Sequence, residues 1–368
     1  MNAVPASSRL MLVLAFVVAF LVHILLFSIA PMASILREAM HLSHAQFGLV
    51  FSVTMISLIL FRLPWGLLAD RNGYVTVLRL ALLLSTAGAF FRVLAQGYHT
   101  FLISQFLMGL GLAATMPCLS LIVREWAPSR PGMGTGTYVA GFALGNAAAL
   151  GLTPLLLRFF QYRQVMLFYA IGCAVVCFAW WVMARSRSAV VSTIRVADFR
   201  AVLREKDMWI LLLMLAAAMG CYDTLATWMP SVLEMKGFDA SLAFLLPVGF
   251  VAAGPVAGFL ADRISNRKRL VCLLGVVATA SIILLIAAPL PLLLVCLVLA
   301  GFASEGVLVV SLMVPVSDPR LSPYAGTVVG LTSSGANVGP LLMPVLFGYL
   351  IDVTGTFVMS LVSVAILA

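Results

Sequence analysis

Charged residues are scarce in this sequence. They make up 10% of its 368 residues, whereas about 25% is usual for a soluble domain. Hydrophobic residues make up 63%, against roughly 45–50% in soluble domains, and the mean hydropathy is +1.14. The apolar runs lack the alternation of polar and apolar residues that a membrane β-barrel needs. These absences exclude a soluble enzyme and a β-barrel, and the sequence predicts an all-α membrane protein.

Motifs for metal, nucleotide and catalytic chemistry are also lacking. There is no phosphate-binding glycine loop and no nucleophile motif, and the eighteen methionines are scattered without a compact methionine and histidine cluster. The cysteines lie within apolar runs without zinc or haem spacing, so we expect buried apolar side chains at Cys118, Cys173, Cys177, Cys221, Cys272 and Cys296. The sequence therefore predicts no enzyme activity, no metal and no cofactor.

Apolar length and turn punctuation divide the chain into twelve expected spans. They cover residues 10–36, 45–67, 75–96, 100–123, 134–157, 165–184, 209–233, 241–261, 270–289, 291–314, 325–350 and 355–368. The first is too long for the apolar core of a cleavable signal. The last would rise only about 20 Å across a hydrocarbon core of about 30 Å, so we expect a truncated twelfth helix.

The basic residues predict the orientation. If the amino terminus is cytoplasmic, sixteen lysines and arginines fall in inside segments, five fall outside, and Arg62 lies within a span. Because positive residues collect on the cytoplasmic side, this bias places both termini there, in a bacterial-type inner or plasma membrane. The formal net charge of +9 is thereby explained without a nucleic-acid partner. We expect a monomer in the lipid bilayer.

The chain contains an internal repeat. The string from Gly66 to Arg71 recurs from Gly258 to Arg263 at an offset of 192, which also pairs Gly109 with Gly301. Such duplication predicts two pseudo-symmetric six-helix bundles with a solute site at their interface, near the middle of the membrane. We expect bundles at residues 1–184 and 209–368, joined by a cytoplasmic linker at 185–208.

The loop that begins at Gly66 resembles a motif of the major facilitator superfamily, G-x-L-x-D-R-x-G-x(5)-R. This resemblance implies a twelve-helix fold and secondary transport by alternating access, in which charged loop residues hold one state closed. Residues of the loop and its repeat then take gating roles; a simple positive anchor for topology is the alternative. The gating candidates are Gly66, Asp70, Arg71, Gly73, Arg79, Gly258, Asp262 and Arg263.

A narrower resemblance links the chain to nitrate/nitrite porters. Arg62 lies eight residues before Asp70, where those porters have an arginine that binds the anion. Their second arginine would fall at Gly254, so a larger anion or another solute fits as well. Gln105 replaces the arginine that many superfamily members carry, and it takes no proton-relay role from them.

Three charged residues are expected deep inside spans, away from the membrane surfaces: Arg62, Asp223 and Glu305. A charge at the membrane centre costs at least about 2.5–3.5 kcal/mol, so each one calls for a function or a partner. We expect Arg62 to bind an anion and Asp223 and Glu305 to carry protons. The alternatives are an internal ion pair between Arg62 and a carboxylate, or structural hydrogen bonding.

Four polar residues complete the expected solute site: His23, Asn146, Tyr222 and Asn337. A histidine in a core and amides that bind helices together are the structural alternatives. The arginines Arg92 and Arg158 are expected to extend to the outer interface. Trp228 fits either an aromatic belt or a cavity wall.

These observations favour a secondary transporter of a small anionic solute, similar in size to nitrate, nitrite, cyanate or small organic anions, with protons as a further partner. One alternative is a proton-coupled carrier of neutral or cationic molecules that uses Asp223 and Glu305. Another is a sensor or assembly factor that does not transport.

Overall fold

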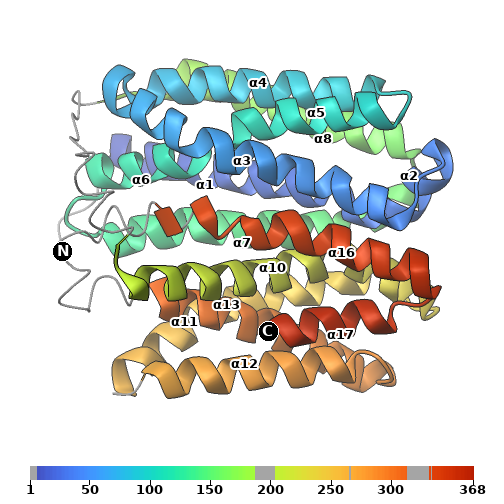
Figure 1. Cartoon of the computed structure of the whole chain (residues 1–368). Coiled ribbons are helices and arrows are strands. Elements are labelled where there is room, and N and C mark those ends of the chain that lie inside the picture. Colours follow the sequence, from blue (N-terminus) through green and yellow to red (C-terminus); the bar gives the residue numbers. More distant parts are fainter. Residues whose placement is uncertain (1–5, 187–203, 265–266, 313–330, 333) are drawn as a thin grey trace.

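The computed structural model describes residues 6–186, 204–264, 267–312, 331–332 and 334–368. Its regular elements in these ranges are α-helices and short 3-10 turns, which confirms the all-α prediction. Figure 1 shows an elongated bundle in which most helices run along a common direction. Eight helical segments of the described part are long and apolar enough to cross a membrane.

The first half of the chain forms one packed group of helices (Figure 1). Its elements are α1 (Ala6–Phe27), η1 (Ala30–Met32), α2 (Ala33–Met40), α3 (His44–Asn72), α4 (Tyr74–Leu94), α5 (Tyr98–Leu112), α6 (Thr115–Trp126), α7 (Pro131–Leu157) and α8 (Tyr162–Met183). Within it, α1 packs on α7, and α4 packs on both α5 and α8.

The second half forms another group. Its elements are α10 (Lys206–Met235), η2 (Ala240–Phe244), α11 (Leu245–Arg263), α12 (Arg267–Leu284), α13 (Leu290–Leu312), α16 (Val338–Thr354) and α17 (Val358–Leu367). Here α13 packs on α11 and α12, and α10 packs on α16 and α13. Most of the expected linker, residues 185–208, and the first part of the eleventh span lie outside the described residues.

Local signals in the sequence end several of these helices. Gly73 has φ +81° and Gly355 has φ +69°, a backbone region that favours glycine, and they end α3 and α16. His41 ends α2 in a left-handed conformation. Two expected spans contain breaks: α1 ends at Phe27 before a 3-10 turn with Pro31, and α5 ends at Leu112 before α6.

Two glycines that are 192 positions apart each allow a close contact between helices. A Cβ on Gly109 of α5 would meet Thr54 of α3, and a Cβ on Gly301 of α13 would meet the backbone of Leu246 of α11. Both members of the second pair lie 192 residues beyond those of the first. Close packing of small residues is a common basis for contact between membrane helices.

Contacts between the two groups run through a few helix pairs. Helix α3 packs along α16, and α7 packs on η2 and α11. These contacts extend from the middle of the bundle to the end that carries His44, Arg158, Asp239 and Asp352, which we call the closed end. In Figure 1 it lies on the right, where α2 and the last turns of α16 are drawn.

Candidate functional site

A hydrogen bond joins the two groups in the interior. The Nδ2 of Asn146, on α7, donates to the hydroxyl of Tyr222, on α10, at 2.9 Å. Asn146 is 1% exposed and Tyr222 is 6% exposed. The Oδ1 of Asn146 is buried and accepts no hydrogen bond within the described part. Two of the expected solute-site residues, 76 positions apart, are thus brought together. The Oδ1 of Asn146 stays available to accept a further hydrogen bond.

The two expected proton carriers are on α10 and α13 of the second group. Asp223 and Glu305 interact electrostatically with each other and with Tyr222. Glu305, on α13, is 7% exposed. Asp223 is half-buried. Because two interacting carboxylates repel each other when both are ionised, the pair is suited to holding a proton.

His23 approaches the same region from α1. Its ring stacks on Phe142 of α7 with centroids 4.5 Å apart, and a Cβ on Gly145 would lie 3.1 Å from the Cβ of His23. Gly145 immediately precedes Asn146 in the sequence. The buried Nδ1 of His23 makes no hydrogen bond to a described residue. His23 therefore lies next to Asn146 with an unused polar atom.

Arg62 lies on α3, within a helix of membrane-spanning length, and its Nε is buried. Two ion pairs join described residues, His44 with Asp352 and Arg158 with Asp239. Both of these ion pairs lie at the closed end of the bundle.

The expected gating residues lie at the end of the bundle opposite the closed end. Arg79 donates to the Trp181 carbonyl at 3.2 Å and stacks on the Trp181 ring, within the first group. Arg71 is exposed and Gly73 provides the turn after α3. A Cβ on Gly66 would lie 3.5 Å from Pro117.

In the repeat loop, the Arg263 guanidinium lies over the Phe259 ring, 4.1 Å from its centroid. The surroundings of Gly258 and of the Asp262 side chain lie outside what the structure describes. Asn337 is buried at the start of α16 and donates to the Ser334 carbonyl at 3.2 Å.

Several expectations need correction. Arg92 does not extend to the interface: it is 1% exposed and donates to the Leu25 carbonyl at 3.0 Å and to Ser28 Oγ at 3.4 Å, because α1 supplies acceptors in the core. Trp228 is fully buried, which excludes an aromatic belt position. Of the six cysteines, Cys272 is exposed rather than buried, because its side of α12 faces outward.

Sequence reasoning missed the polar contacts at the closed end. The carboxylate of Asp352, on α16, bonds the start of α3. Arg158, which is exposed as expected, pairs with Asp239. Hydrogen bonds from Ser241 and the Arg158 guanidinium hold the pKa of Asp239 below its usual range. Asp352 is a lone carboxylate directly after an apolar run, and this was the sequence feature that could have indicated its role.

A metal site and a cavity are two alternatives to this site. The part of the chain that the structure describes contains no group of three histidine, cysteine, aspartate or glutamate residues that could hold a metal ion. A cavity of about 340 Å³ lies near the other end of the bundle, and it is lined by Ser120, Val123, Arg124, Pro128 and Thr135. None of these is an expected site residue.

Known proteins resemble the chain over nearly its whole length. It is 23% identical to the nitrite extrusion protein of Bacillus subtilis strain 168 over 365 residues, which cover 96% of this chain and 89% of the relative. It is 26% identical to the 2-nitroimidazole transporter of Escherichia coli K12 over 350 residues, which cover 92% and 87%.

The fold is also found in a crystal structure of a bacterial homologue of the human lysosomal transporter Spinster, in an inward-facing, unoccupied conformation. The TM-score is 0.82 at 17% identity, and the match covers 99% of this chain and 95% of that one. A family model described as Major Facilitator Superfamily matches residues 15–319 and, in a second match, residues 248–368. The chain therefore belongs to the Major Facilitator Superfamily, and it is a membrane transporter rather than an enzyme.

Proposed function

We propose that the chain is a secondary active transporter that moves a small anionic solute by alternating access and couples this movement to protons. The observation that carries the proposal is the Asn146–Tyr222 hydrogen bond between the two groups of helices, with Asp223 and Glu305 beside it. Polar and titratable groups lie there where a passing solute meets both halves.

In this proposal the two groups of helices are the halves expected from the repeat, residues 1–184 and 209–368. The matching contacts of Gly109 with Thr54 and of Gly301 with Leu246 support a pseudo-symmetric arrangement. The positive-inside bias places the closed end on the outer side and both termini in the cytoplasm. We propose that one chain suffices for transport.

Arg62 is the proposed anion-binding residue. Its guanidinium offers five donors in a planar fork, which suits an oxyanion better than a lysine does. The name of the nitrite extrusion protein, an anion transporter that resembles this chain throughout, favours this assignment. His23 and Asn146 keep buried polar atoms available for the remainder of the solute.

A carrier of neutral or cationic molecules is the second candidate. The amide and hydroxyl of Asn146 and Tyr222 suit an uncharged polar solute, and the 2-nitroimidazole transporter resembles the chain equally well. In this case Asp223 and Glu305 would contact the solute directly.

Counterflow in proteoliposomes tests the proposal. The purified protein is reconstituted with an unlabelled solute inside, and uptake of a labelled solute is followed for nitrate, nitrite, cyanate, small carboxylates, a nitroimidazole and a cationic drug. The proposal predicts saturable exchange of at least one anion that the uncharged and cationic compounds do not inhibit. Exchange of the nitroimidazole or the cation alone would favour the second candidate and contradict the first.

A further inference from the structure

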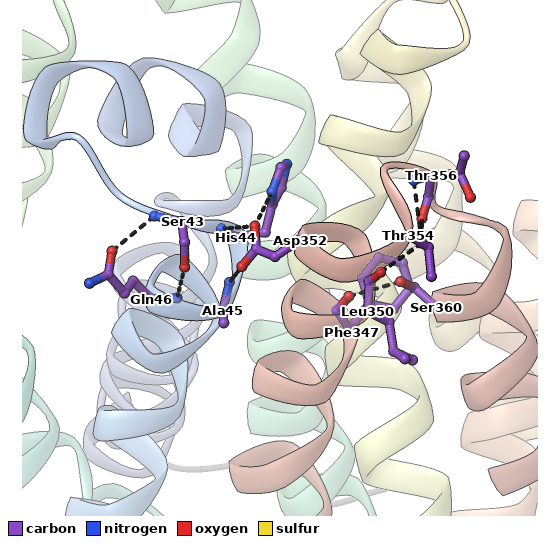
Figure 2. A network of polar contacts seen from close by, with 10 residues as sticks. All are labelled: Ser43, His44, Ala45, Gln46, Phe347, Leu350, Asp352, Thr354, Thr356 and Ser360. Atoms are coloured by element: carbon purple, nitrogen blue, oxygen red, sulfur yellow. Dashed lines mark hydrogen bonds and ion pairs between the residues drawn. The ribbon is translucent and has the colours of Figure 1, made fainter.

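The carboxylate of Asp352 binds the first turn of α3. Its Oδ1 accepts the backbone N–H of His44 at 2.9 Å and lies 2.7 Å from the Nδ1 of the His44 ring. Its Oδ2 accepts the backbone N–H of Ala45 at 2.8 Å. Figure 2 shows all three contacts converging on the one carboxylate, which comes from the other group of helices.

These two amides are the ones that α3 cannot satisfy alone. Ser43 and Gln46 form a capping box: the Ser43 Oγ accepts the Gln46 N–H at 3.2 Å, and the Gln46 Oε1 accepts the Ser43 N–H at 2.9 Å (Figure 2). The first turn of a helix leaves several N–H groups without a partner in the helix itself. The box covers Ser43 and Gln46, and Asp352 covers the two residues between them.

Glycines allow this contact to form. A Cβ on Gly48 of α3 would collide with the Pro344 carbonyl, and a Cβ on Gly348 of α16 would collide with the His44 carbonyl. The backbones of α3 and α16 are therefore in close contact at two successive points near the closed end. The contact orients α16 so that Asp352, one turn after Gly348, lies over the start of α3.

Trp228 of α10 fills the space behind the contact. Its Nε1 donates to the Pro344 carbonyl at 3.0 Å, and its ring lies 5.5 Å from that of Phe347 and 5.3 Å from that of Phe47. Next to the Asp352 contact, α3 and α16 thus pack on an aromatic cluster, and further along them the Ser52 Oγ donates to the Pro340 carbonyl at 3.4 Å.

Another ion pair between the groups at this end is more exposed. Arg158, after α7, pairs with Asp239, which also accepts the Ser241 N–H at 2.8 Å and so caps η2 from its own chain segment. The side chains of Arg158 and Asp239 are 55% and 41% exposed, against 20% for His44 and 25% for Asp352. Exposed pairs are weak and screened by salt.

We propose that Asp352 is the residue that locks the closed end, because it completes the cap of α3 only while the two groups are together. The inference rests on the proposed alternating access. A negative charge at a helix start is favourable, and each hydrogen bond to it is strengthened by the charge. When the end opens, the amides of His44 and Ala45 and the carboxylate of Asp352 turn to water, so the lock breaks without leaving a buried unpaired group.

Hydrogen exchange of the full-length protein in lipid nanodiscs tests the lock. We compare the wild type with Asp352→Asn and with Asp239→Asn, which removes the carboxylate of the more exposed ion pair at the same end. In Asp352→Asn the amides of a peptide covering residues 43–50 should exchange roughly tenfold faster, as the loss of one charge-assisted hydrogen bond predicts. Peptides from α4 and α5 should be unchanged, and Asp239→Asn should have little effect on residues 43–50.

A further variant, His44→Ala, separates the amides from the ring, because it keeps the backbone contacts and removes the imidazole. It should raise exchange less than Asp352→Asn does. Unchanged exchange at residues 43–50 in Asp352→Asn, an equal rise in every peptide, or an equal effect of His44→Ala would overturn the lock. None of these measurements needs a solute, so failure of the lock is distinguishable from failure of the proposed transport, which appears as absent counterflow in the wild type.

Discussion

Asn146 of α7 and Tyr222 of α10 form a buried hydrogen bond of 2.9 Å between the two groups of helices. Any motion that separates the groups at this depth breaks the bond. In the proposed function, a solute bound between the groups contacts the same two side chains, together with Asp223 and Glu305 of the second group.

Replacing Tyr222 by phenylalanine should weaken both folding and solute binding. The variant leaves the buried Asn146 amide without its acceptor, which costs about 1–3 kcal/mol. Tyr169→Phe is a matched control, because it removes a buried hydroxyl that bonds Thr153 at 2.7 Å within the first group. The unfolding temperature should fall in both variants, whereas the KM for counterflow should rise in Tyr222→Phe alone. An equal KM in the two variants would place Tyr222 outside the solute site.

Asp223→Asn should abolish accumulation driven by a pH gradient, because asparagine cannot carry a proton. Solute counterflow needs no net proton movement and should survive. Glu234→Gln, at the exposed end of the same helix, is the control and should accumulate solute normally. Accumulation by Asp223→Asn at the rate of the wild type would exclude this residue as the coupling group.

Asp70→Asn should slow turnover without loss of solute binding. We expect the loop carboxylate to stabilise one conformation, and a change of about 1–3 kcal/mol in such an equilibrium is large enough to stall the cycle. Binding is measured as a ligand-induced rise in Tm and turnover as the rate of counterflow at saturation. A variant that fails to bind yet exchanges at the normal rate when saturated would contradict the gating role.

The pair of Arg158 and Asp239 predicts a weak loss of stability in acid. The pKa of Asp239 lies below its usual range, so the folded state binds this proton less tightly than the unfolded state. Its contribution is therefore complete above the ordinary aspartate pKa of about 3.9 and is lost as the pH falls through the lowered value. Thermal unfolding of the wild type and of Asp239→Asn should differ at pH 6 and converge near pH 3; a constant difference would contradict the pair.

The helices followed from the sequence because apolar runs of this length have few other solutions. The points at which helices end within these apolar runs could not be predicted from the sequence. The 3-10 turn with Pro31 and the division between α5 and α6 lie in continuous apolar sequence, where packing rather than composition decides. The prediction for Arg92 was wrong for the same reason, since its acceptors lie elsewhere in the chain, at Leu25 in α1 and at Ser28 in the turn after it.

The sequence predicted which residues belong to the candidate site, but it did not predict which of them contact one another. Asn146 and Tyr222 stood out as polar residues in apolar runs, yet nothing in a single sequence joins positions 76 residues apart. Asp352 and His44, separated by 308 positions, were missed altogether. The pattern of Ser43 and Gln46 indicates the start of a helix. The partner of the remaining amides of its first turn comes from another helix, and a local pattern does not predict it.

The most direct test of the account is the KM for anion counterflow in Arg62→Lys, with Arg92→Lys as its control. Both arginines lie within membrane-spanning helices, and Arg92 binds only groups of the first half through its described contacts. Lysine keeps the charge but loses the planar fork that an oxyanion fits. We predict that Arg62→Lys stays folded and raises the KM about tenfold or more, the equivalent of one lost charge-assisted hydrogen bond, whereas Arg92→Lys lowers stability and leaves the KM unchanged. Normal uptake by Arg62→Lys, with an unchanged KM, would contradict the anion site.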